Sequence, residues 1–256
     1  MVPQASPRGR PVAHCLFATP YDEEAVDFLA SHDNPAYKIA SFELVDIPLL
    51  RRVGQTGRPV ILSTGMASLA EIDEAVATVR DAEGEQLALL KCTSAYPADP
   101  RYMNLQTITH LAEAFDVPVG LSDHSLEWSV PVAAVAVGAS IIEKHLTLSR
   151  RAPWPDSSYS LEPEEFQQMV AAVRTAHAGL GTVRYGGVSD EAAARRFRRS
   201  LFVVEDIKAG EEFTEQNVRS IRPSDGLHTR YLDHVLGSTA RCDIPRATPL
   251  QWHHLT

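Results

Sequence analysis

The feature that most constrains this fold is a repeat of short apolar segments, each followed by an amphipathic stretch, over about residues 13–178. The repeat is roughly 25 residues long, which suits one strand plus one helix. The apolar segments are HCLFATP, AYKIASFE, PVILSTG, LALLKCTSAYP, VPVGLSDH and SIIEKHLTL. Alternating strands and helices, with mostly apolar strands, predict a parallel sheet covered by helices.

Two of the helices have clear sequence patterns. Ser68 and Glu71 have the spacing of a capping box. The apolar positions that follow on one helix face are Leu69, Ile72, Val76 and Val79. A later helix is predicted from Phe166, Met169, Val170 and Val173.

The strands belong either to an open doubly wound sheet or to a closed barrel. The chain has no GxGxxG or GxxxxGK[ST] loop, which would mark the common nucleotide-binding open sheets. Polar residues end nearly every strand segment, whereas an open sheet concentrates them at one point. We therefore predict a (β/α)8 TIM-type barrel with about six of its βα units present.

The missing strands fall at the N-terminal end of the predicted barrel. Residues 1–12 are irregular and lead abruptly into a full strand. One interpretation is a disordered tail on a smaller open sheet. The interpretation that we favour is that the first two βα units are absent, so that residues 13–178 form a partial barrel.

A second, smaller domain is predicted after the barrel. Residues 179–199 are glycine-rich and then basic, and indicate a linker whose arginines form a solvated or intersubunit surface. Residues 200–256 contain two similar segments, EDIKAGEEF and CDIPRATPL. Such a repeat of turns between apolar residues predicts a compact β-rich module.

Composition excludes several classes of protein. The net charge of −9 argues against a non-specific nucleic-acid binder. The three cysteines are far apart and form no CxxC pair, so we expect a reducing, cytoplasmic location. No apolar run approaches the roughly 20 residues of a membrane span, and we expect no membrane partner.

His124 and His145 are the main candidates for chemistry. His124 ends the segment VPVGLSDH, and His145 lies in the next segment, SIIEKHLTL. Neighbouring parallel strands would place both side chains at one rim of the barrel, each near an acid. Hydrogen-bonded rim histidines and metal ligands are both consistent with this pattern.

Lys38 and Glu43 lie in a single strand segment, AYKIASFE. A buried ammonium requires a negative partner, which is either an anionic ligand, Glu43 or another acid at the rim. Simple alternation puts Lys38 and Glu43 on opposite faces, so the strand end must bend if both serve one site. Hydroxyls at the ends of other strands, such as Ser63 and Ser122, would bind a phosphate or carboxylate.

Taken together, these motifs closely resemble the sialic acid synthase family. The matching runs are FATPYDEEAVDFL, AYKIASFEL, PVILSTGMAS, KCTSAYP, GLSDHS, GASIIEKHLTL and PDSSYSLEPEEF. Residues 200–256 resemble the antifreeze-like, or SAF, domain of the same family. The resemblance implies that HCLFATPYD corresponds to the third barrel strand.

The resemblance implies condensation of phosphoenolpyruvate with an N-acetylated amino sugar to give a nonulosonic acid. PDSSYS and SIRPSDGLHTRYLDHVLG are similar to the pseudaminic acid branch, which uses a 6-deoxy-diacetamido sugar. APWPD departs from the family pattern, because glycine usually precedes Pro-Asp. The alternatives are an N-acetylneuraminate or legionaminate synthase, and a truncated, inactive fragment.

The resemblance also implies roles for single residues. His124 and His145 would hold a divalent metal, Mn²⁺ with Mg²⁺ or Co²⁺ as alternatives, and Glu43 and Lys38 would be catalytic. The implied substrate-binding residues are Thr19, Ser41, Ser63, Thr93, Tyr96, Ser122, Glu143, Asp156 and Arg222. Arg222 would reach the active site of a partner subunit, which implies a homodimer.

Overall fold

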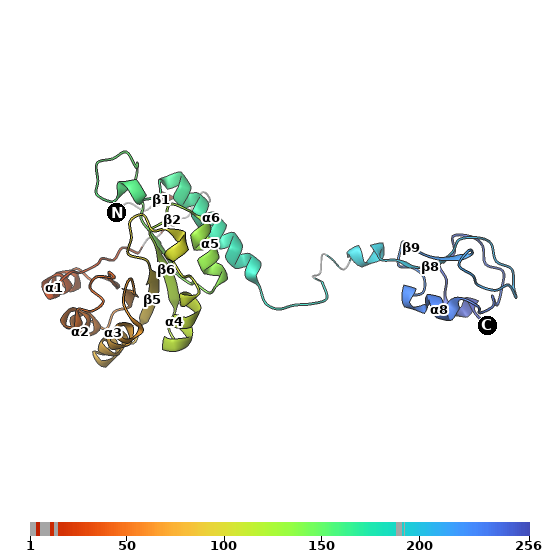
Figure 1. The fold of residues 1–256 in the computed structure, drawn as a ribbon, viewed down its shortest axis with the longest axis horizontal. Coiled ribbons are helices and arrows are strands. Elements are labelled where there is room, and N and C mark those ends of the chain that lie inside the picture. Colours follow the sequence, from red (N-terminus) through yellow and green to blue (C-terminus); the bar gives the residue numbers. More distant parts are fainter. Residues whose placement is uncertain (1–3, 6–10, 13–14, 188–190, 192) are drawn as a thin grey trace. The chain divides into compact units, whose positions relative to one another are not determined.

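The computed structural model describes residues 4–5, 11–12, 15–187, 191 and 193–256 (Figure 1). It divides into two compact units, Met1–Gly181 and Thr182–Thr256. No helix in the described part of the chain is long and apolar enough to cross a lipid bilayer.

The first unit is built on a parallel sheet whose strands pair in the order β3-β4-β5-β6-β7. These strands are β3 (Tyr37–Ile39), β4 (Val60–Ser63), β5 (Leu87–Cys92), β6 (Val119–Asp123) and β7 (Ile142–Lys144). A separate antiparallel pair joins β1 (Gln4–Ala5) and β2 (Pro11–Val12). The main sheet is a half-barrel, which agrees with the predicted incomplete (β/α) barrel.

Helices surround the sheet in an arc (Figure 1). They are α1 (Glu23–Ser31), α2 (Ile47–Gly54), α3 (Leu69–Asp81), α4 (Thr107–Phe115), α5 (Ser129–Ala136) and α6 (Pro163–Leu180). The predicted capping box is confirmed at α3, where the Ser68 amide donates to Glu71 Oε2 at 2.6 Å. The predicted helix around Met169 is confirmed as α6, and Met169 is buried.

The first predicted strand, HCLFATP, is wrong as a full strand over the residues described. Only Ala18 forms an isolated parallel bridge, with Tyr37 of β3, and residue 14 lies outside the described residues. The apolar pattern is real, but Leu16 and Phe17 are exposed, at 69% and 39%. The segment lacks the packing that would keep it in a strand.

Alternation along the strands separates the two faces of the sheet. Tyr37, Leu62, Leu89 and Leu121 are almost fully buried and pack with the helices in one hydrophobic core. The neighbouring positions carry polar side chains on the other face. In the strand register Ser122 lies opposite both Cys92 and Glu143, so a polar row crosses three strands at their carboxyl ends.

Gly120 lets β6 and β7 approach closely. A Cβ at this position would lie 2.3 Å from the carbonyl oxygen of Ile141, which accepts the β-ladder hydrogen bond from Leu121. We expect Gly120→Ala to lower the free energy of unfolding by about 1–3 kcal/mol, because the clash is with backbone. Urea unfolding of the two proteins measures this change in the free energy of unfolding.

Gly179→Ala is the matched control for this substitution. Gly179 lies in α6, and an added Cβ there meets no atom within 4 Å. Alanine favours a helix by about 1 kcal/mol over glycine, so stability should be kept or slightly raised. Equal unfolding midpoints for the two variants would contradict the proposed close approach.

The second unit is small and β-rich. Its antiparallel pair is β8 (Ser200–Val203) with β9 (Val218–Ile221), followed by the short helix α8 (Leu232–Val235). The two similar segments found in the sequence pair with each other, through an antiparallel bridge between Ile207 and Ile244. Around them Phe213, Val235 and Leu250 are fully buried.

Candidate functional site

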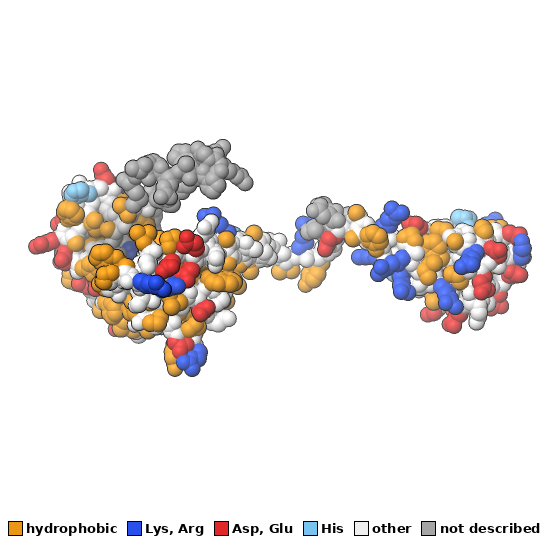
Figure 2. All heavy atoms as spheres, turned by 90° about the horizontal axis from the view of Figure 1, so that it is seen from above, with side chains coloured by type: hydrophobic (Ala, Val, Ile, Leu, Met, Phe, Trp, Pro, Cys, Tyr) orange, Lys and Arg blue, Asp and Glu red, His pale blue; other side chains and the backbone are white. Residues whose placement is uncertain are grey.

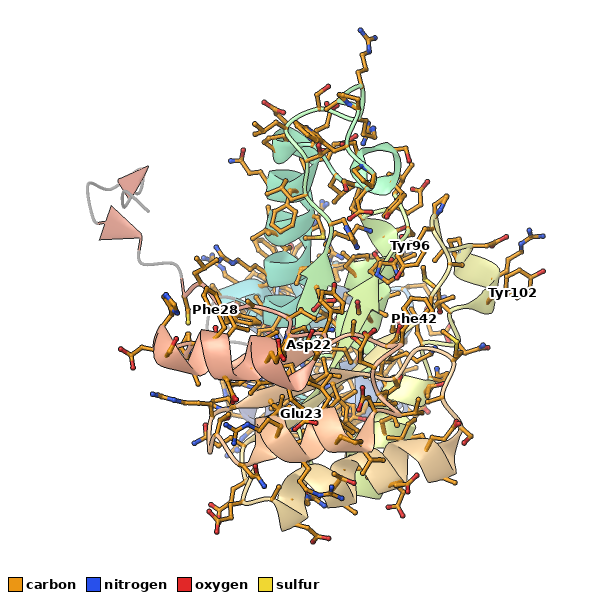
Figure 3. All side chains as sticks on the ribbon, turned by 90° about the vertical axis from the view of Figure 1, so that its left-hand side faces the viewer. Asp22, Glu23, Phe28, Phe42, Tyr96 and Tyr102 are labelled. Carbon is orange, nitrogen blue, oxygen red and sulfur yellow. The ribbon has the colours of Figure 1, made fainter. Side chains whose placement is uncertain are left out.

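The carboxyl ends of β3 to β7 line a cavity of about 480 Å³ in the first unit. Two residues that line it, Phe42 and Tyr96, are labelled in Figure 3. The predicted site residues that line it are Thr19, Lys38, Ser41, Glu43, Ser63, Tyr96, Ser122, His124, Glu143, His145 and Asp156. Parallel strands place their ends at one rim, which is why residues far apart in sequence meet here.

Two predicted site residues do not line this cavity. Thr93 acts on the site through its backbone, because its carbonyl oxygen lies 3.0 Å from His124 Nδ1. Arg222 follows β9 in the second unit. Its predicted role in a partner subunit's site stays a prediction.

His124 and His145 face each other with ring centroids 5.3 Å apart. A carbonyl oxygen can only accept, so Thr93 fixes the proton of a neutral His124 ring on Nδ1. Nε2 is then left with its lone pair, the form in which imidazole binds metals. His124 is buried, whereas the His145 side chain is one-third exposed.

The two rings differ in their electrostatic surroundings. Burial lowers the pKa of His124, but hydrogen bonds to the Cys92 thiol and the Thr93 carbonyl outweigh it, so the pKa lies above its usual value. Burial and then the charge of His124 hold the pKa of His145 below its usual value. His145 is therefore neutral at pH 7 and available as a ligand.

The loop after β7 surrounds His145. Leu161 donates its amide to the His145 carbonyl at 3.0 Å. Asp156 Oδ2 lies 3.9 Å from His145 Nδ1, and the Tyr159 ring lies edge-on at 5.3 Å. Tyr159 donates to Asp156, and burial followed by this carboxylate raises the pKa of Tyr159 to about 12.

Lys38 is a buried cation that lines the cavity. Its ammonium donates to the Ile39 carbonyl at 2.9 Å and lies 3.6 Å from Glu143 Oε2. Of the predicted partners, the rim acid is therefore Glu143. Burial lowers the pKa of Lys38, and Glu143 offsets only part of this effect. Ser122 donates to the other oxygen of this carboxylate, Glu143 Oε1, at 2.6 Å.

Glu43 reaches the same cavity because β3 ends early. The chain turns after Ile39, and the Glu43 amide donates to the Ala40 carbonyl at 3.1 Å. The predicted bend at the strand end is therefore present. Among the buried side-chain atoms described, Glu43 Oε2 and Ser63 Oγ have no hydrogen-bond partner. Buried polar atoms without partners are costly, so both point to a polar ligand.

Several cavity residues were not among the predicted site residues. They are Tyr21, Ala40, Phe42, Cys92, Asp123, Lys144 and Tyr159. Cys92 could have been found from alternation, since it shares a face with Ser122 once the two strands are paired. Tyr159 stands in the PDSSYS run, but only the turn at Ser157–Tyr159 brings it onto His145.

Known protein families match both units of the chain. The NeuB family matches residues 12–185, and the SAF domain matches residues 198–256. Together the two matches span most of the sequence.

Characterised relatives cover the same region. A pseudaminic acid synthase of Campylobacter jejuni is 43% identical over 228 residues, which are 89% of this chain and 66% of that protein. An N,N'-diacetyllegionaminic acid synthase of Legionella pneumophila is 35% identical over 245 residues, 94% of this chain and 69% of that protein. This chain thus spans slightly less than two thirds of the first relative.

The fold agrees with solved structures. The Bacillus subtilis spore coat polysaccharide biosynthesis protein spsE superposes with a TM-score of 0.62 at 36% sequence identity. The superposition covers 94% of this chain and 73% of that one.

Proposed function

Because this chain belongs to the NeuB family, as the match over residues 12–185 shows, we propose that it carries the site of a nonulosonic acid synthase. The reaction is the condensation of phosphoenolpyruvate with an N-acetylated amino sugar and water, giving a nonulosonic acid and phosphate. Such an enzyme is a carbon–carbon bond-forming transferase.

The observation that carries this proposal is the pair of unpartnered buried atoms, Glu43 Oε2 and Ser63 Oγ, in the cavity that also holds Lys38. A buried ammonium with a lowered pKa favours an anion beside it. A free hydroxyl supplies a hydrogen bond to the same anion. We assign the phosphate and carboxylate of phosphoenolpyruvate to Lys38, Ser41, Ser63 and Ser122, with Thr19 beside them.

The two histidines fit a divalent metal with most of its coordination left for water and substrate. Their rings are adjacent, and in its neutral form His124 carries the ring proton on Nδ1, which makes Nε2 the nitrogen that can bind a metal. No group of three or more His, Cys, Asp or Glu side chains suited to a metal is found in the described part of the chain. Two imidazoles plus oxygen ligands suit Mn²⁺, with Mg²⁺ or Co²⁺ as alternatives. When bound, the metal supplies Lewis acidity toward the sugar aldehyde.

The bond changes follow from the groups around the cavity. A bond forms between C3 of phosphoenolpyruvate and the aldehyde carbon of the open-chain sugar. Positive charge then develops at C2, and Glu43 stabilises it and takes a proton from the water that adds there. The C2 hydroxyl gives up its proton as the C2–O bond to phosphate breaks, which leaves a C2 carbonyl and free phosphate. The proton that Glu43 took from water goes to the oxygen of the former aldehyde, which becomes a hydroxyl. The fixed donors of Lys38 and Ser63 hold the departing group.

We assign the sugar to the part of the cavity beside Tyr96 and Asp156, with Glu143 between the sugar and Lys38. The 6-deoxy-diacetamido sugar of pseudaminic acid synthesis is favoured by the PDSSYS run and by the 43% identical relative. The legionaminic acid synthase at 35% identity supports the same reaction with another sugar.

A phosphate-release assay tests the reaction. The purified 256-residue chain is mixed with phosphoenolpyruvate, Mn²⁺ and, in turn, the 6-deoxy-diacetamido sugar, N-acetylmannosamine and the legionaminate precursor. We expect the first sugar to give the highest kcat/KM. Equal use of N-acetylmannosamine would overturn the pseudaminate assignment. A chain that binds no Mn²⁺ and no phosphoenolpyruvate would overturn the proposed site.

An inactive form of the same site is the second candidate. The described sheet has an edge at β3, where Ala18 makes a single bridge, and an edge at β7, where Leu161 bridges Leu146. The described strands therefore do not close into a barrel around the cavity. Binding of Mn²⁺ and phosphoenolpyruvate without phosphate release from any sugar would support this candidate.

A homodimer is part of the same proposal. Arg222 of the second unit would contact the sugar in a partner subunit's cavity. A mixture of Arg222→Ala with a cavity variant would then regain activity through mixed dimers.

A further inference from the structure

We propose that the buried ion pair between Asp123 and Lys144 positions His124 and His145 relative to each other. The inference rests on the proposed function, because it assigns the pair to the metal site of that function. Neither residue is a metal ligand in this proposal. Both act through the strand ends that carry the histidines.

The pair joins two neighbouring strands at their ends. Asp123 and Lys144 are Cα partners in the β6–β7 register and the final residues of the two strands. Their side chains meet at 2.5 Å between Lys144 Nζ and Asp123 Oδ2. The next residue on each strand is a candidate ligand, so the pair fixes the register immediately before His124 and His145.

The same cluster also holds the chain after His124. The Ser125 amide donates to Asp123 Oδ1 at 2.8 Å. Lys144 Nζ donates to the Ser125 carbonyl and, at 3.3 Å, to Ser125 Oγ. The backbone is therefore tied on both sides of His124 by one ammonium and one carboxylate. This constraint is independent of the Thr93 contact that orients the ring.

This pair is more deeply buried than the other ion pairs of the described residues. The Lys144 and Asp123 side chains are 1% and 0% exposed, whereas the Arg52–Asp27 pair is 41% and 56% exposed. Both residues border the cavity, but strand alternation directs their side chains to the face opposite the histidines. They are therefore placed to support ligands rather than to contact substrate.

Stability alone does not account for a buried pair of this kind. Apolar residues of similar size often replace a buried ion pair without loss of stability, because desolvation cancels the attraction. Partners that orient metal ligands, by contrast, change metal affinity about 10- to 100-fold when they are removed. The location next to both histidines favours the second role.

The test is the double variant Asp123→Asn with Lys144→Gln in the full chain, which removes both charges together. Mn²⁺ binding is measured from the electron paramagnetic resonance signal of free Mn²⁺, and folding from circular dichroism. We expect a folded protein whose Mn²⁺ dissociation constant is raised about 10- to 100-fold. Asp27→Asn with Arg52→Gln, an exposed pair between α1 and α2, is the matched control and should bind Mn²⁺ normally.

A folded double variant that binds Mn²⁺ within twofold of the unchanged chain would overturn the positioning role. If that variant does not fold, Asp123→Leu with Lys144→Met replaces it, with the same expectation, because an apolar pair leaves no buried charge.

A second measurement separates this inference from the proposed metal site. The imidazole ¹⁵N–¹H signals of His124 and His145 are recorded without metal, with His228 and His234 of the second unit as internal references. We expect the first two to shift in the double variant and the references to stay. Unchanged signals would overturn the positioning role, whereas shifted signals in a chain that binds no Mn²⁺ would overturn only the metal site.

Discussion

Replacing both strand-end histidines, His124→Ala with His145→Ala, should raise the Mn²⁺ dissociation constant at least about 100-fold, beyond the usual effect of removing a supporting residue. The ring centroids lie 5.3 Å apart, and removing both rings takes away the two imidazole ligands proposed for the metal. Isothermal titration with Mn²⁺ measures the change.

The control for the histidine variant lies in the second unit. His228→Ala with His234→Ala removes two histidines that are not among the residues lining the cavity, and should leave Mn²⁺ affinity unchanged. The cavity variant should still fold, although the Thr93 carbonyl loses its donor at a cost of about 1–3 kcal/mol. Normal Mn²⁺ binding by a folded His124→Ala, His145→Ala protein would refute the assignment of these ligands.

Lys38→Met should weaken phosphoenolpyruvate binding about 10- to 150-fold, because a charged hydrogen bond contributes about 1.5–3 kcal/mol. It should not lower the stability of the fold to the same extent. Burial lowers the pKa of Lys38, so a neutral side chain avoids a desolvation cost. Glu143 keeps the donor Ser122. Fluorescence titration with phosphoenolpyruvate and urea unfolding separate the two effects.

Lys91→Met is the matched control for Lys38→Met. Lys91 is also buried in the sheet, donates to the Cys92 carbonyl at 2.6 Å and has a pKa lowered by burial. It lies on the face of β5 away from the polar row, because Cys92 is the residue that faces Ser122. Equal losses of phosphoenolpyruvate affinity in the two variants would show that Lys38 has no special contact with the ligand.

The residues at the rim of the sheet could be predicted because they follow from patterns among neighbouring residues in the sequence. A strand pattern of period two, followed by a helix, places the end of each strand at a common edge. His124, His145, Lys38 and Ser63 are all near such ends, and all line one cavity. The α3 capping box was predictable for the same reason, since Ser68 and Glu71 are neighbours in sequence.

The partners across strands could not be predicted, because they depend on register. A shift of one residue would place Glu143 on the other face of the sheet. The sequence left an anionic ligand, Glu43 and another rim acid as possible partners for Lys38. Only the pairing of Ser122 with Glu143 shows that Glu143 is the acid beside it. The Asp123–Lys144 pair could not be predicted for the same reason, because it also depends on the register of β6 and β7.

The strand predicted from HCLFATP failed for a different reason. Its residues have the right composition, yet side chains such as Leu16 remain exposed along with other large hydrophobics of the first unit, including Phe28 and Phe42. Hydrophobic side chains are visible among the charged ones on the face shown in Figure 2. Strand propensity acts only where a neighbour supplies packing.

The strand order β3-β4-β5-β6-β7 also has a consequence for synthesis on the ribosome. Each strand of this sheet pairs with the strand that precedes it in the chain. A newly synthesised βα unit can therefore pair with the exposed edge of the previous strand, and the loop that must close is short. Lys38 and Ser63 are thus in place while His124 is still being translated. His145, on the last strand, completes the histidine pair, and a nascent chain should gain affinity for Mn²⁺ only once β7 has left the exit tunnel.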